Sequence, residues 1–139
     1  MSKIYIIGSL RNSKIPQVAR CLRGDGHTVF DDWFSPGPQC DDEWQKYESE
    51  RGRSYKEALE GYHAEHQFAF DLKHIREAEV GVLVLPAGKS GHMELGYMIG
   101  RGQRGYILLE EAEPTRYDLM YKFAHGIALD LEELKEMVV

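Results

Sequence analysis

Three short, uninterrupted apolar runs constrain the fold of this chain more than any other feature of its sequence. They are residues 3–8 (KIYIIG), 80–85 (VGVLVL) and 105–109 (GYILL). Runs of this length indicate buried strands of a parallel sheet, because such a sheet is covered on both faces and needs no polar alternation. Residues 27–30 (HTVF) and 126–129 (GIAL) predict a fourth and a fifth strand.

Helical periodicity fills the segments between these runs. One pattern follows the cap candidates Asn12 and Ser13, a second joins Phe68, Leu72 and Ile75, and others cover residues 90–101 and 131–137. The first pattern consists of Ile15, Val18, Ala19 and Leu22. Strands that alternate with helices predict one α/β domain over residues 1–139: a three-layer, Rossmann-like or flavodoxin-like parallel sheet of about five strands.

The middle of the chain interrupts this alternation. Residues 33–67 form an insertion longer than a minimal crossover, rich in aromatic and charged side chains, which we expect to be partly helical. Two interpretations remain open for its aromatic residues. They pack over the sheet and against a partner subunit, or they form a lid over a planar ligand.

Composition narrows the classes of function. The net charge of -6 and pI of about 5.5 argue against a nucleic-acid polymer as partner, while a few local Arg or Lys side chains can still hold a small phosphorylated ligand. No apolar run is long enough for a membrane span. Cys21 and Cys40 are expected to be reduced thiols of a cytoplasmic protein. We expect no cofactor and no metal, because His63 and His66 lack further converging ligands.

The segment Gly88-Lys89-Ser90 has the appearance of a nucleotide-phosphate loop. A Walker loop also requires a glycine five positions earlier, where this chain has Leu83. The pattern therefore fails. What remains is a loop at the carboxyl end of a central strand, where open α/β sheets bind ligands.

Two sites near predicted strand ends carry candidate chemistry. Glu94 is expected in the first turn of a helix capped by Ser90 or Gly91, where the helix dipole favours an ionised carboxylate, or it is a plain helix cap. Residues 8–13 (GSLRNS) open another helix and combine backbone N–H groups, hydroxyls and Arg11 into an anion site, or they form an ordinary cap. Asp71 is a second candidate carboxylate, with a solvated helix position as its alternative.

Three segments together resemble one family. They are residues 5–12 (YIIGSLRN), 71–85 (DLKHIREAEVGVLVL) and 90–102 (SGHMELGYMIGRG). In order and spacing they are similar to the nucleoside 2-deoxyribosyltransferase superfamily, and most of all to its 2'-deoxynucleoside 5'-phosphate N-hydrolase branch. The resemblance covers about half of the chain.

The resemblance implies specific roles. Glu94 matches the family's nucleophile, Tyr5 the tyrosine that positions it, and Asp71 the aspartate near the leaving base or sugar. Gly8, Ser9 and Arg11, with Asn12 and Ser90, match the segments that bind the 5'-phosphate. Trp33 and His92 are our candidates for contact with the base.

The implied activity is hydrolysis of the N-glycosidic bond of a (deoxy)nucleoside 5'-monophosphate, in a homodimer or higher homo-oligomer. Two alternatives stay open: a deoxyribosyltransferase that exchanges bases, and a non-catalytic nucleotide-binding module. Transferases of the family usually carry Asp in the loop where this chain has Pro86-Ala87. In the hydrolases of the family, a serine from a neighbouring subunit also binds the phosphate. Roughly in that region this chain has Thr115-Arg116-Tyr117.

Overall fold

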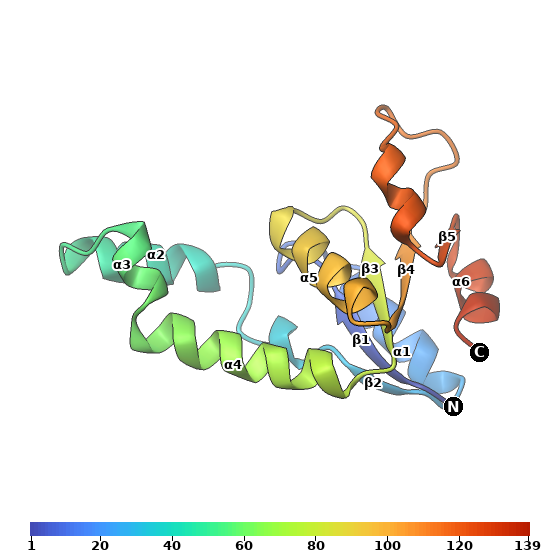
Figure 1. Ribbon diagram of the computed structural model, residues 1–139, viewed down its shortest axis with the longest axis horizontal. Coiled ribbons are helices and arrows are strands. Elements are labelled where there is room, and N and C mark those ends of the chain that lie inside the picture. Colours follow the sequence, from blue (N-terminus) through green and yellow to red (C-terminus); the bar gives the residue numbers. More distant parts are fainter.

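A five-stranded, fully parallel sheet in the order β2-β1-β3-β4-β5 forms the centre of the protein (Figure 1). The computed structural model describes all residues from 1 to 139. The strands are β1 (Lys3–Ile7), β2 (Thr28–Phe30), β3 (Val80–Val84), β4 (Arg104–Leu108) and β5 (Gly126–Ala128). All five predicted strands are therefore confirmed, with ends that differ by one residue at most.

Helices cover both faces of this sheet, which gives the predicted three layers. On one face, α1 (Ile15–Gly24) and α6 (Leu131–Met137) pack against side chains such as Ile4 and Val82. On the other, α4 (Tyr62–Glu77) and α5 (Lys89–Gly100) pack against Tyr5 and Leu83. Because side chains alternate along a strand, Tyr5 and Ile7 point to the α4–α5 face while Ile4 and Ile6 point to the opposite face.

The insertion forms an arm that leaves the body of the protein. After a short 3-10 turn, η1 (Asp32–Phe34), the helices α2 (Cys40–Glu50) and α3 (Tyr55–Leu59) lie beside the first half of α4, which extends beyond the sheet (Figure 1). The buried Glu48 carboxylate pairs with Arg53 at 2.8 Å and with Arg51 at 3.2 Å. Glu48 and Ala58 are the buried residues of α2 and α3, so these two helices carry no apolar periodicity that would predict the arm.

Most aromatic residues of the insertion do not cover the sheet. Tyr47, Tyr55 and Tyr62 are exposed on the arm, and Phe34 packs toward the α1–α6 face. Phe68 also departs from expectation, since two thirds of it (66%) is exposed although the predicted pattern placed it on a buried helix face. Only Ile75, near the end of α4, is buried, because the helix meets the sheet with its last turns.

Two helices begin at other residues than expected. The N-cap of α1 is Lys14, and the side chain of Asn12 instead accepts a hydrogen bond from the Lys14 N–H (3.0 Å). The helix α5 begins at Lys89 after Gly88, so Ser90 and Gly91 lie within its first turn and do not cap it. The link between β4 and β5 contains η2 (Leu119–Phe123). None of the helices combines the length and apolar character needed to cross a membrane.

Two strand glycines let α5 lie close to the sheet. A Cβ on Gly81 of β3 would stand 2.6 Å from the Met98 sulfur, and one on Gly105 of β4 would stand 2.7 Å from Cγ1 of Ile99 and 2.8 Å from Cδ1 of Leu95. All three distances are shorter than the contacts that real Cβ atoms make. The position of α5 therefore depends on the absence of these two side chains.

We expect Gly105→Ala to destabilise the protein by about 1–3 kcal/mol, because the added methyl group forces Ile99 and Leu95 to move in a closely packed layer. Urea denaturation measures the change. Gly96→Ala is the matched control on α5, where an added Cβ meets nothing within 4 Å. That substitution should instead stabilise the helix by about 0.5–1 kcal/mol. Equal effects of the two substitutions would contradict the packing argument.

Candidate active site

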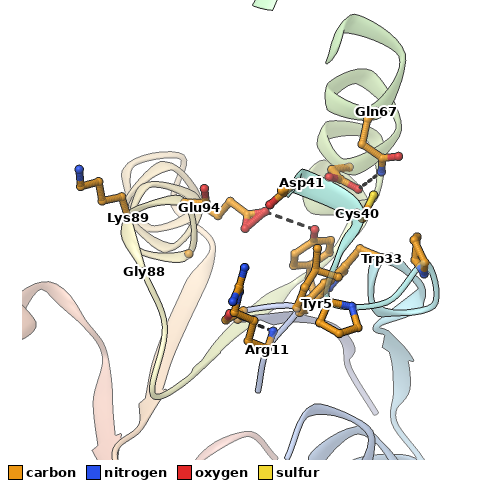
Figure 2. Close-up of a pocket in the computed structure, with 17 residues that line it drawn as sticks. Tyr5, Arg11, Trp33, Cys40, Asp41, Gln67, Gly88, Lys89 and Glu94 are labelled. Carbon is orange, nitrogen blue, oxygen red and sulfur yellow. Dashed lines mark hydrogen bonds between the residues drawn. The ribbon is translucent and has the colours of Figure 1, made fainter. Parts of the chain in front are cut away.

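A cavity of about 320 Å³ opens at the carboxyl edge of the sheet, beside β1 and β3 (Figure 2). Its volume is at the lower end of the range of small-molecule sites. The β1–α1 loop, the segment around η1, the first turn of α2, the middle of α4 and the start of α5 form its wall. It lies where open parallel sheets place their ligands.

The cavity brings together most of the residues singled out from the sequence. Those that line it are Tyr5, Gly8, Ser9, Arg11, Trp33, Asp71, Ser90 and Glu94. They come from four separate segments of the chain. The carboxylates, the anion-binding loop and the aromatic candidate thus face one space.

Glu94 and Tyr5 meet across this space. The Tyr5 hydroxyl donates a hydrogen bond to Oε1 of Glu94 at 3.4 Å (Figure 2). Burial, together with the neighbouring Glu94 carboxylate, holds the pKa of Tyr5 well above its usual range. Tyr5 therefore stays protonated and acts as a permanent hydrogen-bond donor to Glu94.

The ionisation of Glu94 differs from the sequence-based expectation. Burial, reinforced by the negative charge of Asp71, raises the pKa of Glu94 to about 7, while the hydrogen bond from Tyr5 acts in the opposite direction. The expected dipole effect is weak because α5 begins at Lys89, which places Glu94 beyond the first turn. Desolvation thus outweighs the helix dipole at this position.

The raised pKa predicts a pH-dependent stability. Between pH ~4.5 and 7 the folded state binds more protons at Glu94 than the unfolded chain does, so the free energy of unfolding decreases as pH rises through this range. Glu94→Gln lacks this titration. We expect the free energy of unfolding of the variant to exceed that of the parent by about 2–3 kcal/mol at pH ~8. Near pH ~4.5 the difference should be less than ~0.5 kcal/mol.

Urea denaturation at the two pH values measures this difference. The substitution Glu65→Gln, on the exposed part of α4, is the control for removal of a surface carboxylate. A gain in stability that is the same at both pH values would contradict the assignment of the titration to Glu94.

Asp71 is held by a neighbour that the sequence analysis did not select. The side-chain amide of Gln67, one turn earlier on α4, donates to Oδ1 of Asp71 at 3.2 Å. Burial raises the pKa of Asp71, and the Gln67 hydrogen bond and His74 oppose that rise. The i, i+4 spacing of Gln67 and Asp71 was the signal that could have identified this pair.

The loop that follows β1 has the features of an anion site. Oγ of Ser9 accepts a hydrogen bond from the Arg11 backbone N–H at 3.0 Å, which folds the loop back on itself. The Arg11 guanidinium reaches Oδ2 of Asp42, at the start of α2, at 2.8 Å. Lys89 also borders the cavity, but its side chain extends away from the other labelled residues (Figure 2).

Two of the selected residues lie outside the cavity lining. The buried Asn12 amide donates to the carbonyl oxygens of Val84 (3.3 Å) and Pro86 (3.4 Å), so it ties two loops together. His92 contacts the Gly88 carbonyl oxygen at 2.7 Å and the Tyr121 hydroxyl at 2.9 Å. Neither side chain joins the other candidates, because local partners already occupy their polar atoms.

The insertion adds wall residues that no sequence signal indicated. Pro36, Pro38, Cys40 and Asp41 line the cavity opposite α5. Trp33 is fixed in the wall because its indole N–H donates to the Ile6 carbonyl at 2.8 Å. Of the six aromatic residues between positions 33 and 62, Trp33 is the one that lines the cavity.

No cluster of three or more His, Cys, Asp or Glu side chains is arranged to hold a metal ion. A second, more open hollow lies between the end of β4 and η2, and Arg116 and Tyr117 line it together with Tyr121. The Arg116–Tyr117 segment is therefore not part of the lining of the first cavity in the same chain.

Comparison with solved structures identifies two proteins of the same fold. The 2-deoxyribosyltransferase of Bacillus psychrosaccharolyticus superposes with a TM-score of 0.66 at 19% identity, over 96% of this chain and 90% of that one. The CMP N-glycosidase BcmB of Clostridium botulinum superposes with a TM-score of 0.58 at 15% identity, over 98% of this chain and 97% of that one.

Comparisons of the sequence alone were negative, since no family model and no curated protein matches it. The structural likeness nevertheless extends over nearly the full length of both solved structures. The fold implied by the three sequence segments is confirmed: this chain has the fold of a 2-deoxyribosyltransferase and of a CMP N-glycosidase.

Proposed function

We propose that this protein is an N-glycosidase that hydrolyses a (deoxy)nucleoside 5'-monophosphate and releases a free base and a sugar phosphate. The observation that carries the proposal is the meeting of Glu94, Tyr5 and Asp71 with the Gly8–Arg11 loop in one cavity. The enzyme class also agrees with the two solved structures of the same fold, a transferase and a glycosidase.

Glu94 is suited to the first chemical step. Its carboxylate attacks the anomeric carbon as the bond from that carbon to the base nitrogen breaks, and the bonding electrons leave with the base. Positive charge develops on the sugar during this step, and a partly buried carboxylate stabilises it strongly because little water screens the interaction. The Tyr5 hydroxyl orients Glu94 through its hydrogen bond.

Asp71 is suited to the proton transfers. Burial raises the pKa of Asp71 above that of a free aspartate, and we take the reactive form of the pair to be the one with the shared proton on Asp71 and the negative charge on Glu94. In that form Asp71 can donate the proton to the departing base. The resulting Asp71 carboxylate then accepts a proton from water as that water attacks the anomeric carbon and frees Glu94. The step releases the sugar phosphate and returns both carboxyl groups to their starting states.

The Gly8–Arg11 loop and Ser90 would hold the 5'-phosphate. The loop precedes α1 and Ser90 lies in the first turn of α5, and both places present hydrogen-bond donors to the cavity. Arg11 adds the positive charge that a phosphate dianion requires. A phosphate fixed there orients the sugar toward Glu94, and Trp33 offers an aromatic face to the base.

Base exchange is the second candidate activity, because a 2-deoxyribosyltransferase superposes on this chain with a TM-score of 0.66. The two activities share the Glu94 intermediate and differ in whether water or a second base attacks it. Incubation with a panel of nucleosides and nucleoside monophosphates, with and without an added acceptor base, distinguishes them.

Chromatography of the products gives the result. Free base released from monophosphates alone supports hydrolysis, and a new nucleoside formed only with the acceptor supports transfer. Thermal stabilisation by nucleotides without any product would overturn both activities in favour of a nucleotide-binding module.

A homo-oligomer is part of the proposal. Large apolar side chains are exposed on α4, α5 and η2, among them Phe68 (66%), Met93 (76%), Leu119 (71%) and Phe123 (70%). Exposed apolar side chains in such numbers are typical of a surface that contacts another subunit. Sedimentation equilibrium gives the mass of the assembly, and a monomer at micromolar concentration would contradict this part.

A further inference from the structure

The Arg11 side chain is engaged by a carboxylate of the protein itself. Its guanidinium nitrogen lies 2.8 Å from Oδ2 of Asp42. The contact joins the loop after β1 to the first turn of α2, segments that lie 31 residues apart in the sequence. It is the ion pair through which the body of the protein holds the start of the arm beside the cavity.

This pair is open to exchange. The side chains of Arg11 and Asp42 are 69% and 61% exposed, so water and dissolved ions reach both partners. Exposed ion pairs of this kind contribute little to stability and give way readily to a competing anion. A phosphate group offers the same guanidinium more charge and more acceptor oxygens than a carboxylate does.

We propose that Asp42 is a specificity-determining residue: it occupies Arg11 as an internal anion, and the phosphate of the substrate must displace it. The proposal rests on the proposed function, because it takes Arg11 as the phosphate ligand. Asp42 therefore lowers the affinity of the site for phosphate, and it returns to Arg11 when the sugar phosphate leaves. A nucleoside without phosphate leaves the pair intact.

Of the carboxylates in the first turn of α2, the one at position 42 takes part in the proposed exchange. This turn carries three successive carboxylates, Asp41, Asp42 and Glu43, of which Asp42 pairs with Arg11. Asp41 lines the cavity, whereas Glu43 forms no ion pair and is not part of the lining. Glu43→Gln therefore removes the same charge from the same turn without touching the proposed exchange.

Calorimetric titration with inorganic phosphate at fixed ionic strength tests the proposal. We expect Asp42→Asn to bind phosphate up to about fivefold more tightly than the parent, the limit set by the small contribution of an exposed pair. Glu43→Gln should stay within about twofold of the parent. In an Arg11→Ala background, Asp42→Asn should bring no further gain, because the two residues act on one interaction.

Other outcomes overturn it. Equal gains from Asp42→Asn and Glu43→Gln would mean that general charge near the cavity sets the affinity. If Asp42→Asn binds phosphate no more tightly than the parent, the proposed exchange is wrong. A gain in phosphate affinity that persists in the Arg11→Ala background would also contradict it. Titration requires no turnover, so tighter binding without any base release contradicts the proposed function alone, and base release with unchanged binding contradicts this inference alone.

Discussion

Replacing Glu94 by alanine should reduce base release from nucleoside monophosphates by roughly 10³-fold or more. The variant lacks the carboxylate that faces the Tyr5 hydroxyl, and with it the group that we propose attacks the anomeric carbon and counters its charge. The effect should appear in kcat more than in KM, because the carboxylate acts mainly in the transition state. Chromatographic measurement of the released base over several hours can detect a rate reduced to this extent.

Two controls separate chemistry from folding in this experiment. Glu65→Ala removes an exposed carboxylate from α4 and should retain parental activity. Glu94→Gln should lose activity to a similar extent as Glu94→Ala while it gains stability at alkaline pH, since removal of a poorly solvated charge stabilises the fold. Full activity in Glu94→Ala would show that the proposed mechanism is wrong.

Asp71→Asn should reduce kcat by about 10²- to 10³-fold, the usual range for loss of a general acid. The size of the loss should depend on the leaving base. A base methylated at a ring nitrogen already carries positive charge and departs without a proton, so the variant should recover most of its activity on such a nucleotide. Parallel assays with a normal and a methylated purine nucleoside monophosphate measure this ratio.

The pH profile provides a second measure of the same residue. The reactive form needs one proton on the Asp71–Glu94 pair, so the parent should lose activity on the alkaline side as the pair gives up that proton. Asp71→Asn should lack that decrease. An equal loss on both substrates, with an unchanged profile, would mean that Asp71 only supports the cavity wall.

The sheet and the centre of the site could be predicted from the sequence for the same reason. Continuous apolar runs mark strands that are buried on both faces, and the carboxyl ends of parallel strands meet at one edge. Tyr5 and Arg11 are placed at that edge by β1 and its loop, and Glu94 by the helix that follows β3. Two segments distant in sequence could therefore be assigned to one site.

The rest depended on features that short-range patterns do not encode. The arm is held by Glu48 and its two arginines, and its helices α2 and α3 carry no apolar periodicity. Asp42 could not be paired with Arg11 without the path of that arm. Asn12 was a candidate for the phosphate because of its place in the loop after β1, and His92 was a candidate for the base. Their polar groups are instead used by Gly88, Tyr121 and the carbonyls of Val84 and Pro86.

The two glycines beneath α5 affect the candidate site although neither of them lines it. Gly81 and Gly105 set how near the helix lies to the sheet. Glu94 belongs to the same helix, and its carboxylate contacts the hydroxyl of Tyr5 on β1. A methyl group added at either strand position would push the helix outward and lengthen a contact that is already 3.4 Å. The reach of Glu94 into the cavity is thus adjustable from inside the hydrophobic layer, through two residues that do not line that cavity.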